Sequence, residues 1–232
     1  MESAFAEQLL LRYRSPMPST ETISHAELRK LKIDQSFLSA LLQVYENPTT
    51  VPSHLFDAFS LDTIVDYIQR THRFYLTKKI CEIEQSIRIL LEDYNAAHPF
   101  LFFLTKFFTD YTKDLTHHIH CEEDELLPYI KIMSATEQGK QSLAQFIEAS
   151  LQYSLGGFID AHDDTEGALS HAKKVVDSYA PSNTSITPHR ILINQLMNFE
   201  TDLRIHAFIE EKVLIPRAIA LEKKLLTLKN QA

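Results

Sequence analysis

The chain has 232 residues, of which 44% are hydrophobic, and carries a formal net charge of −8 at pH 7. This size allows one large hydrophobic core, while the acidic balance argues against a nucleic-acid groove or an anionic membrane surface as the main partner. The two cysteines are not spaced as C-x-x-C, and neither a basic leader nor a long apolar run occurs, so we expect a cytoplasmic protein without a disulfide scaffold, a thiolate metal site or a membrane span.

The apolar periodicity predicts helices and no β-sheet, because the four glycines leave long stretches uninterrupted. A shorter helix is predicted first, opened by Ser24 in a capping box, and Ser60 is predicted to cap the second helix. In chain order the helices are Ser24 to Tyr45, Leu61 to Tyr94, Pro99 to Met133, part of Lys140 to Tyr179, and Pro188 past Leu221.

Four long helices with short connections predict an all-α fold, an antiparallel four-helix bundle. We assign residues 60–232 to this bundle and residues 1–59 to an N-terminal helical appendage, which caps the bundle or forms a homodimer contact. The phenylalanines of the third helix, Phe100, Phe103, Phe107 and Phe108, are spaced as a core stripe.

One phrase, D-L-x-x-H-x-x-x-E-E-x-x-L-x-P, occurs twice, from Asp114 to Pro128 and from Asp202 to Pro216. In each copy a histidine precedes a glutamate by four residues, about one helical turn, so both side chains project from one helix face. A single exposed pair of this kind is common without a metal, but the repeated flanking residues favour metal ligation. Two such helices side by side would offer two imidazoles and two carboxylates, which suit iron, manganese or zinc. The predicted pairs are His118 with Glu122 and His206 with Glu210.

Helical rise tests which other histidines reach the same level. At about 1.5 Å per residue, His118 and His206 lie at similar depths along their helices, and His72 on the opposite-running second helix reaches that level too. His98 opens the third helix, roughly 30 Å from His118, and is excluded. His162 reaches the level only if the fourth helix breaks near Gly156-Gly157, so we predict a break there.

The order of an isolated histidine, H-x-x-x-E, a histidine followed by acids, and H-x-x-x-E resembles the hemerythrin-like HHE cation-binding bundles. It is most similar to the di-iron Repair of Iron Centres proteins, over about Leu61 to Leu221. The resemblance implies two iron ions in an oxo- or hydroxo-bridged centre, with manganese or zinc as substitutes. The implied metal ligands are His72, His118, Glu122, His162, His206 and Glu210.

Two departures from these families are visible. The chain has no cysteine before Cys81, whereas Repair of Iron Centres proteins begin with a small domain that bears a cysteine pair. Oxygen-carrying hemerythrins have an additional histidine one turn before the third-helix ligand, where this chain has Phe158. Four histidines would ligate the two metals more equally and leave positions for water or a diatomic molecule.

Three functions remain open from the sequence. The first is a non-haem di-iron protein that binds or senses O₂ or nitric oxide, or handles iron in oxidative or nitrosative stress. The second is a di-iron enzyme that reduces peroxide or nitric oxide. The third is a metal-free helical module that binds a protein partner.

Beside the predicted ligands, several residues are expected to be bystanders. His117 and His120 lack a glutamate four residues on, and Glu123 and Glu211 point about 100° away around the helix. Asp114 and Asp202 precede the ligand histidines by one turn and are either acceptors for an imidazole N–H or ordinary surface acids.

Overall fold

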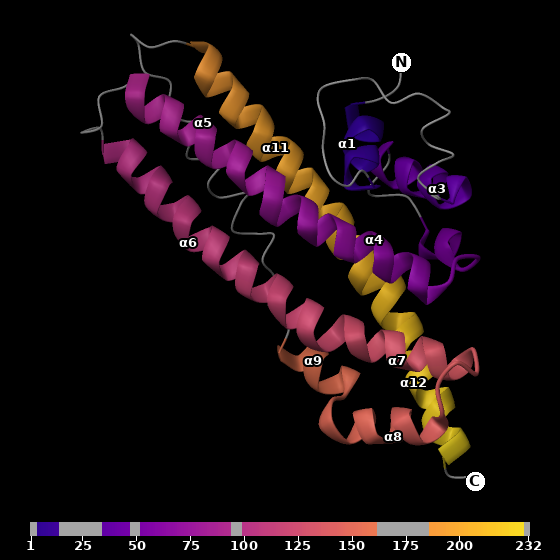
Figure 1. The fold of residues 1–232 in the computed structure, drawn as a ribbon. Helices are drawn as coiled ribbons and strands as arrows, with labels where there is room; N and C mark the ends of the chain where they lie inside the picture. The colour runs from indigo at the N-terminus through magenta and orange to yellow at the C-terminus, as the bar shows by residue number, and fades with distance from the viewer. Residues whose placement is uncertain (1–3, 14–33, 47–51, 94–98, 162–185, 230–232) are drawn as a thin grey trace. The chain divides into compact units, whose positions relative to one another are not determined.

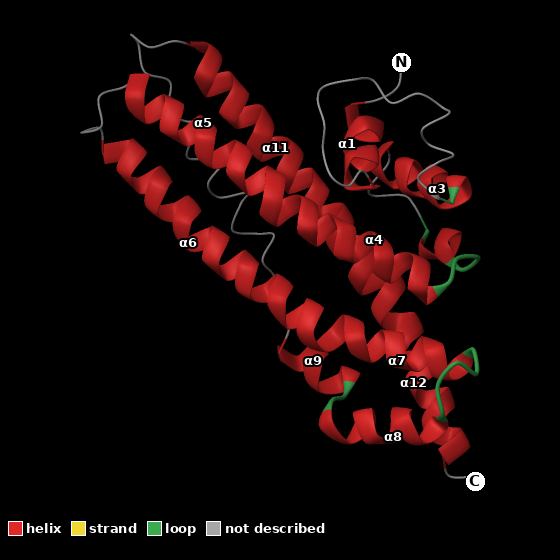
Figure 2. Cartoon of the chain, viewed as in Figure 1, coloured by secondary structure: helices red, strands yellow, loops and turns green. Residues whose placement is uncertain are grey.

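The computed structural model describes residues 4–13, 34–46, 52–93, 99–161 and 186–229. Within these ranges every regular element is a helix and none is a strand (Figures 1 and 2). The predicted all-α helical bundle is therefore confirmed. None of the helices in these ranges is both long and apolar enough to cross a membrane.

The chain divides into two compact units. The first comprises residues 1–74, 130–149 and 205–232, and the second comprises residues 75–129 and 150–204. At three boundaries between the units, each within a long helix, the chain stays helical. Each of these boundaries lies at a π-helical turn or within a few residues of one. The boundary predicted between residues 59 and 60 remains a prediction.

The first unit joins the N-terminal helices to α4 (Leu61–Phe74). Its other elements are α1 (Ala4–Tyr13), α3 (Gln35–Glu46), the 3-10 helix η1 (Ser53–Phe56), the later parts of α7 (Leu127–Glu137) and α11 (Ile186–Ile209), most of α8 (Leu143–Gln152), η4 (Glu210–Leu214) and α12 (Ile215–Lys229). An aromatic cluster holds α3, η1 and α4 together. The fully buried ring of Phe37 meets three others edge-on, with centroid distances of 6.0 Å to Phe56, 5.0 Å to Phe59 and 5.9 Å to Tyr67.

Two helix starts in this unit follow from their capping residues. Ser60 accepts a hydrogen bond on Oγ from the Thr63 amide at 3.1 Å, so the predicted cap of α4 is confirmed. Asp34 accepts amide hydrogen bonds from Ser36 and Phe37, at 2.8 and 3.2 Å. A cap interrupts a helix, so the prediction of one continuous helix from Ser24 to Tyr45 is wrong at Asp34. Ser24 itself lies outside the described residues.

The second unit is built on the packing of α5 (Ile80–Asp93) against α6 (Pro99–Cys121). It also contains η2 (Tyr75–Lys79), η3 (Glu122–Leu126), α9 (Leu155–Ala161) and most of α11. Pro99 opens α6 as predicted. Phe108 is buried, but Phe103 is 47% exposed and stacks along the helix on Phe107, so the predicted core stripe is wrong at Phe103, on the solvent side of the helix.

The segments η2, η3 and η4 are single π-helical turns inserted into long helices. In η3 and η4 the turn begins at the glutamate of the repeated phrase, and the phrase's proline follows the turn by two residues. Proline has no N–H to donate, and its ring clashes with the carbonyl four residues earlier. A wider turn immediately before Pro128 or Pro216 relieves that clash, which gives the repeated proline a structural role. No proline follows η2, and nothing in the structure explains that turn.

The fourth predicted helix is interrupted near the predicted place. The structure has α8 and α9 separated at Tyr153-Ser154, two residues before the glycine pair. Ser154 accepts the Gly157 amide on its Oγ at 3.3 Å, so a serine cap, and not the glycines, marks the break. His162 lies just beyond α9, outside the described residues.

Candidate metal centre

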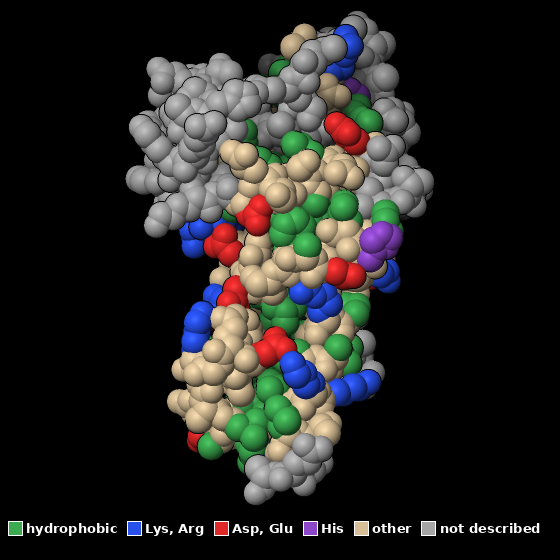
Figure 3. Space-filling model, turned by 90° about the vertical axis from the view of Figure 1, so that its right-hand side faces the viewer, with side chains coloured by type: hydrophobic (Ala, Val, Ile, Leu, Met, Phe, Trp, Pro, Cys, Tyr) green, Lys and Arg blue, Asp and Glu red, His purple; other side chains and the backbone are tan. Residues whose placement is uncertain are grey.

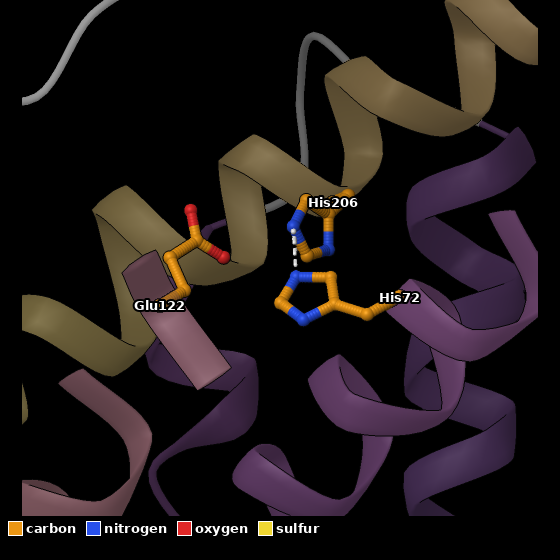
Figure 4. Close-up of side chains that lie close together, drawn as sticks. All are labelled: His72, Glu122 and His206. Atoms are coloured by element: carbon orange, nitrogen blue, oxygen red, sulfur yellow. Dashed lines mark hydrogen bonds between the residues drawn. The ribbon is translucent and has the colours of Figure 1, made fainter. Parts of the chain in front are cut away.

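His72 and His206 bring two imidazoles together inside the first unit. His72 lies on the buried stripe of α4, one and two turns after Ile68 and Ile64, which explains why its ring points inward. Its Nε2 lies 3.2 Å from the Nε2 of His206, and the ring planes meet at 66° (Figure 4). Two donors that are each about 2.1 Å from one metal ion are roughly 3 to 3.4 Å apart at right-angled to tetrahedral geometry. The spacing of the two nitrogens therefore fits a shared metal.

A carboxylate of the same unit completes this group. Glu210 is the first residue of η4, and its Oε2 lies 3.5 Å from the Nε2 of His206, four residues earlier. The η4 turn contacts α4, the helix that carries His72. The first unit thus contributes two nitrogens and one carboxylate.

The second unit contains the other copy of the repeated pair. His118 Nε2 lies 2.6 Å from Glu122 Oε1, across one helical turn at the junction of α6 and η3. The predicted arrangement, with histidine and glutamate on one face, is confirmed in both copies. His118 is half-buried and the Glu122 side chain is fully buried.

Five of the six predicted ligands therefore lie among the described residues. All five belong to groups of histidine and glutamate side chains that could hold a metal ion. Three come from the first unit and two from the second. Figure 4 draws His72 and His206 together with Glu122. The sixth ligand, His162, is outside the described residues.

Three of the four expected bystanders are exposed, whereas four of the five described ligands are buried. His117 and His120 are exposed, and Glu211 is exposed and forms a 3.3 Å ion pair with Lys212. Glu123 is half-buried.

The two aspartates of the repeated phrase differ in burial. Asp202 is buried one turn before His206, whereas Asp114 is exposed one turn before His118. The repeated phrase gave no signal for this difference, because the two copies are identical at this position. Exposure makes Asp114 an ordinary surface acid, and only Asp202 remains a candidate acceptor for an imidazole N–H.

Sequence reasoning also missed a residue that contacts the turn carrying His72. Arg12 of α1 is buried and hydrogen-bonds Thr71, the residue before His72. No sequence signal marked it, because Arg12 belongs to no recognisable motif.

The donor chemistry fits a divalent or trivalent cation of intermediate hardness. His72, His206 and Glu210 are 1%, 7% and 2% exposed, and Glu122 is 0% exposed. Imidazole nitrogens and carboxylate oxygens in this mixture suit iron, manganese or zinc. The two cysteines are not among these donor groups, so the set is not one for copper(I) or an iron–sulfur cluster.

Sequence comparisons relate the chain to named proteins. It is 27% identical over 205 residues to the iron-sulfur cluster repair protein YtfE of Enterobacter sp. (strain 638), covering 86% of this chain and 84% of that protein. It is 22% identical over 201 residues to the iron-sulfur cluster repair protein ScdA of Staphylococcus epidermidis, covering 85% and 84%. The chain is therefore weakly similar to proteins named for iron-sulfur cluster repair.

No protein-family model matches the chain. A third similar protein aligns over a shorter part of the chain. The ScdA protein of Staphylococcus haemolyticus is 21% identical over 152 residues, and the match spans 66% of this chain and 64% of that protein. The resemblance to Repair of Iron Centres proteins expected from the motifs is therefore supported as remote similarity to repair proteins.

Proposed function

We propose that this protein holds a pair of iron ions and handles iron under oxidative or nitrosative stress. The ligands would be His72, His118, Glu122, His162, His206 and Glu210. With six protein ligands for two ions, coordination positions would remain for a small molecule such as O₂ or nitric oxide. Manganese or zinc would be substitutes with the same donors.

The burial of ionisable donors is the observation that carries this proposal. Glu122 and Glu210 are almost fully removed from solvent, together with His72 and His206. A carboxylate buried without a compensating cation costs several kcal/mol or takes up a proton. Two metal ions bound to these donors would neutralise the carboxylates and use the imidazole lone pairs. The metal-free interaction module is disfavoured, because it gives these groups no reason to be buried.

The relatives support the iron-handling part of the proposal. Their names describe repair of iron–sulfur clusters, a process that requires iron. Within this chain the described residues include His and Glu groups able to hold a metal. The cytoplasmic setting, and the choice between a binding protein and an enzyme that reduces peroxide or nitric oxide, stay predictions.

Metal analysis of the purified protein tests the proposal. We expect about two iron ions per chain by mass spectrometry after anaerobic loading with ferrous iron, and near-ultraviolet absorption after oxidation. A protein that stays folded but retains no stoichiometric iron, manganese or zinc would overturn it. Consumption of nitric oxide or peroxide over many turnovers would favour the enzyme over the binding protein.

A further inference from the structure

A buried cation from the N-terminal helix contacts the turn of α4 that carries His72. Arg12 is only 5% exposed. Its Nη1 donates hydrogen bonds to the Tyr67 hydroxyl and the Thr71 Oγ1, both at 3.0 Å. Thr71 and Tyr67 are one turn apart on α4, and Thr71 immediately precedes His72. A single guanidinium thus binds two successive turns next to the candidate ligand.

The same guanidinium also binds α3 and packs on aromatic rings. Its Nη2 donates to the Tyr45 hydroxyl at 2.9 Å, and its central carbon lies 5.2 Å from the ring centroid of Phe74 and 5.6 Å from that of Tyr67. The planar fork of arginine can satisfy several acceptors and stack on aromatic faces at once, which a lysine ammonium cannot do. These contacts hold Arg12 in one orientation.

The contacts of Arg12 on α4 bracket His72 in the sequence. Tyr67 and Thr71 lie before it and Phe74 lies after it. Helix α1 contacts α4, and the hydrogen bonds of Arg12 place this contact at Tyr67 and Thr71. The rotation of this turn about the axis of α4 decides whether the imidazole of His72 faces His206, and a misplacement of about 1 Å is enough to impair a metal ligand.

We propose that Arg12 is a positioning residue for the candidate metal centre. By binding Thr71 and Tyr67 it holds the His72 turn in the orientation that brings Nε2 towards His206. Helix α1 thereby contributes to metal binding without supplying a ligand. This inference rests on the proposed function, since it concerns the affinity of the metal proposed there.

The test compares Arg12→Lys with Arg70→Lys in the full chain. Arg70 is a matched control: it also joins α4 to α1, stacking 4.9 Å from the Tyr13 ring centroid, but it is partly exposed and pairs with Asp66. Ferrous iron affinity is measured anaerobically by competition with a chelator, and apoprotein stability by thermal unfolding. We expect Arg12→Lys to weaken iron binding about 10-fold, the lower end for residues that orient metal ligands, and Arg70→Lys to leave it unchanged.

A second variant separates positioning from general stability. Thr71→Val keeps the side-chain volume and removes the hydroxyl that Arg12 binds, so it should also weaken iron binding while the apoprotein remains folded. If Arg12→Lys fails to fold, the iron affinity of Thr71→Val alone tests the positioning role.

The outcomes are distinguishable. Lower thermal stability with unchanged iron affinity in both Arg12→Lys and Thr71→Val would show that the contact is only structural, and the inference would fail. If the parent protein does not bind ferrous iron, the proposed function itself fails.

Discussion

The Nε2 atoms of His72 and His206 lie 3.2 Å apart, although 134 residues separate them in the chain. Each residue occupies a buried position on its own helix. A buried imidazole normally directs its polar atoms to a hydrogen-bond partner. Here the two rings direct the same atom at one another, within reach of the Glu210 carboxylate that follows His206. This relationship is the basis for the predictions on metal binding.

The metal content should be two ions per chain. Six predicted ligands with two carboxylates in matching positions of the repeat imply a paired site, and the metals of such sites are roughly 3 to 4 Å apart. X-ray absorption spectroscopy of the iron-loaded protein should show an iron–iron distance in this range. One tetrahedral zinc per chain would contradict the prediction.

Replacing either repeated glutamate should remove metal while the bundle stays folded. Glu122→Gln and Glu210→Gln keep the side-chain volume but remove a negative charge and one metal-binding oxygen, so we expect the loss of at least one metal ion per chain. Metal analysis and circular dichroism measure the two effects. The matched controls are Glu123→Gln and Glu211→Gln, one position later in each copy, which should retain the metal. Two ions with an unchanged spectrum in both ligand variants would show that neither carboxylate is a metal ligand.

The histidines should separate into ligands and bystanders. Alanine at a ligand removes a metal–nitrogen bond, so iron should be strongly depleted, whereas alanine at a bystander should leave iron near the parental amount. The predicted ligands are His72, His118, His162 and His206, and the predicted bystanders are His98, His117 and His120. The comparison of His162→Ala with His98→Ala is the most informative. If His98→Ala removed the iron and His162→Ala did not, the ligand assignment from helical rise and the one implied by the family resemblance would both be wrong.

The aromatic cluster around Phe37 predicts that α3 and η1 unfold together with α4. Phe37→Ala removes a fully buried ring that contacts η1 and α4, so it should lower the free energy of unfolding by about 3–5 kcal/mol. Urea denaturation followed by circular dichroism measures this loss. The exposed Phe102 provides a control, since Phe102→Ala should change stability by no more than about 0.5 kcal/mol. A parental stability in Phe37→Ala would show that the appendage is independent of the bundle.

The helical class and the two donor pairs could be predicted because they depend on local geometry. The four-residue spacing of His118 and Glu122 places both side chains on one face of any α-helix, and the structure has their donor atoms 2.6 Å apart. The cap at Ser60 and the helix start at Pro99 were likewise predictable, because each depends on a residue and its immediate neighbours. The break before α9 was predicted to within two residues, because helix ends are marked by local residues such as a capping serine or a glycine.

Other features were not predicted from the sequence pattern. The cap at Asp34 competes with a continuous helical pattern, and the π-helical turns arise within sequences that read as unbroken helix. Asp114 and Asp202 occupy the same position in the repeated phrase, yet only Asp202 is buried. Burial depends on what the rest of the chain packs against each helix, and a single helix does not encode it.

From the sequence alone came the all-α class and the residue types of the candidate site, because both follow from spacing along one helix. Only the tertiary structure decided that His72 meets His206 and that Arg12 binds Thr71. These pairs are 134 and 59 residues apart in the chain. The apolar periodicity of each helix does not predict which faces of two helices will pack together. Their contact is set by the packing of whole side chains, since a rotation of either helix by one residue, about 100°, would turn the donors away from each other.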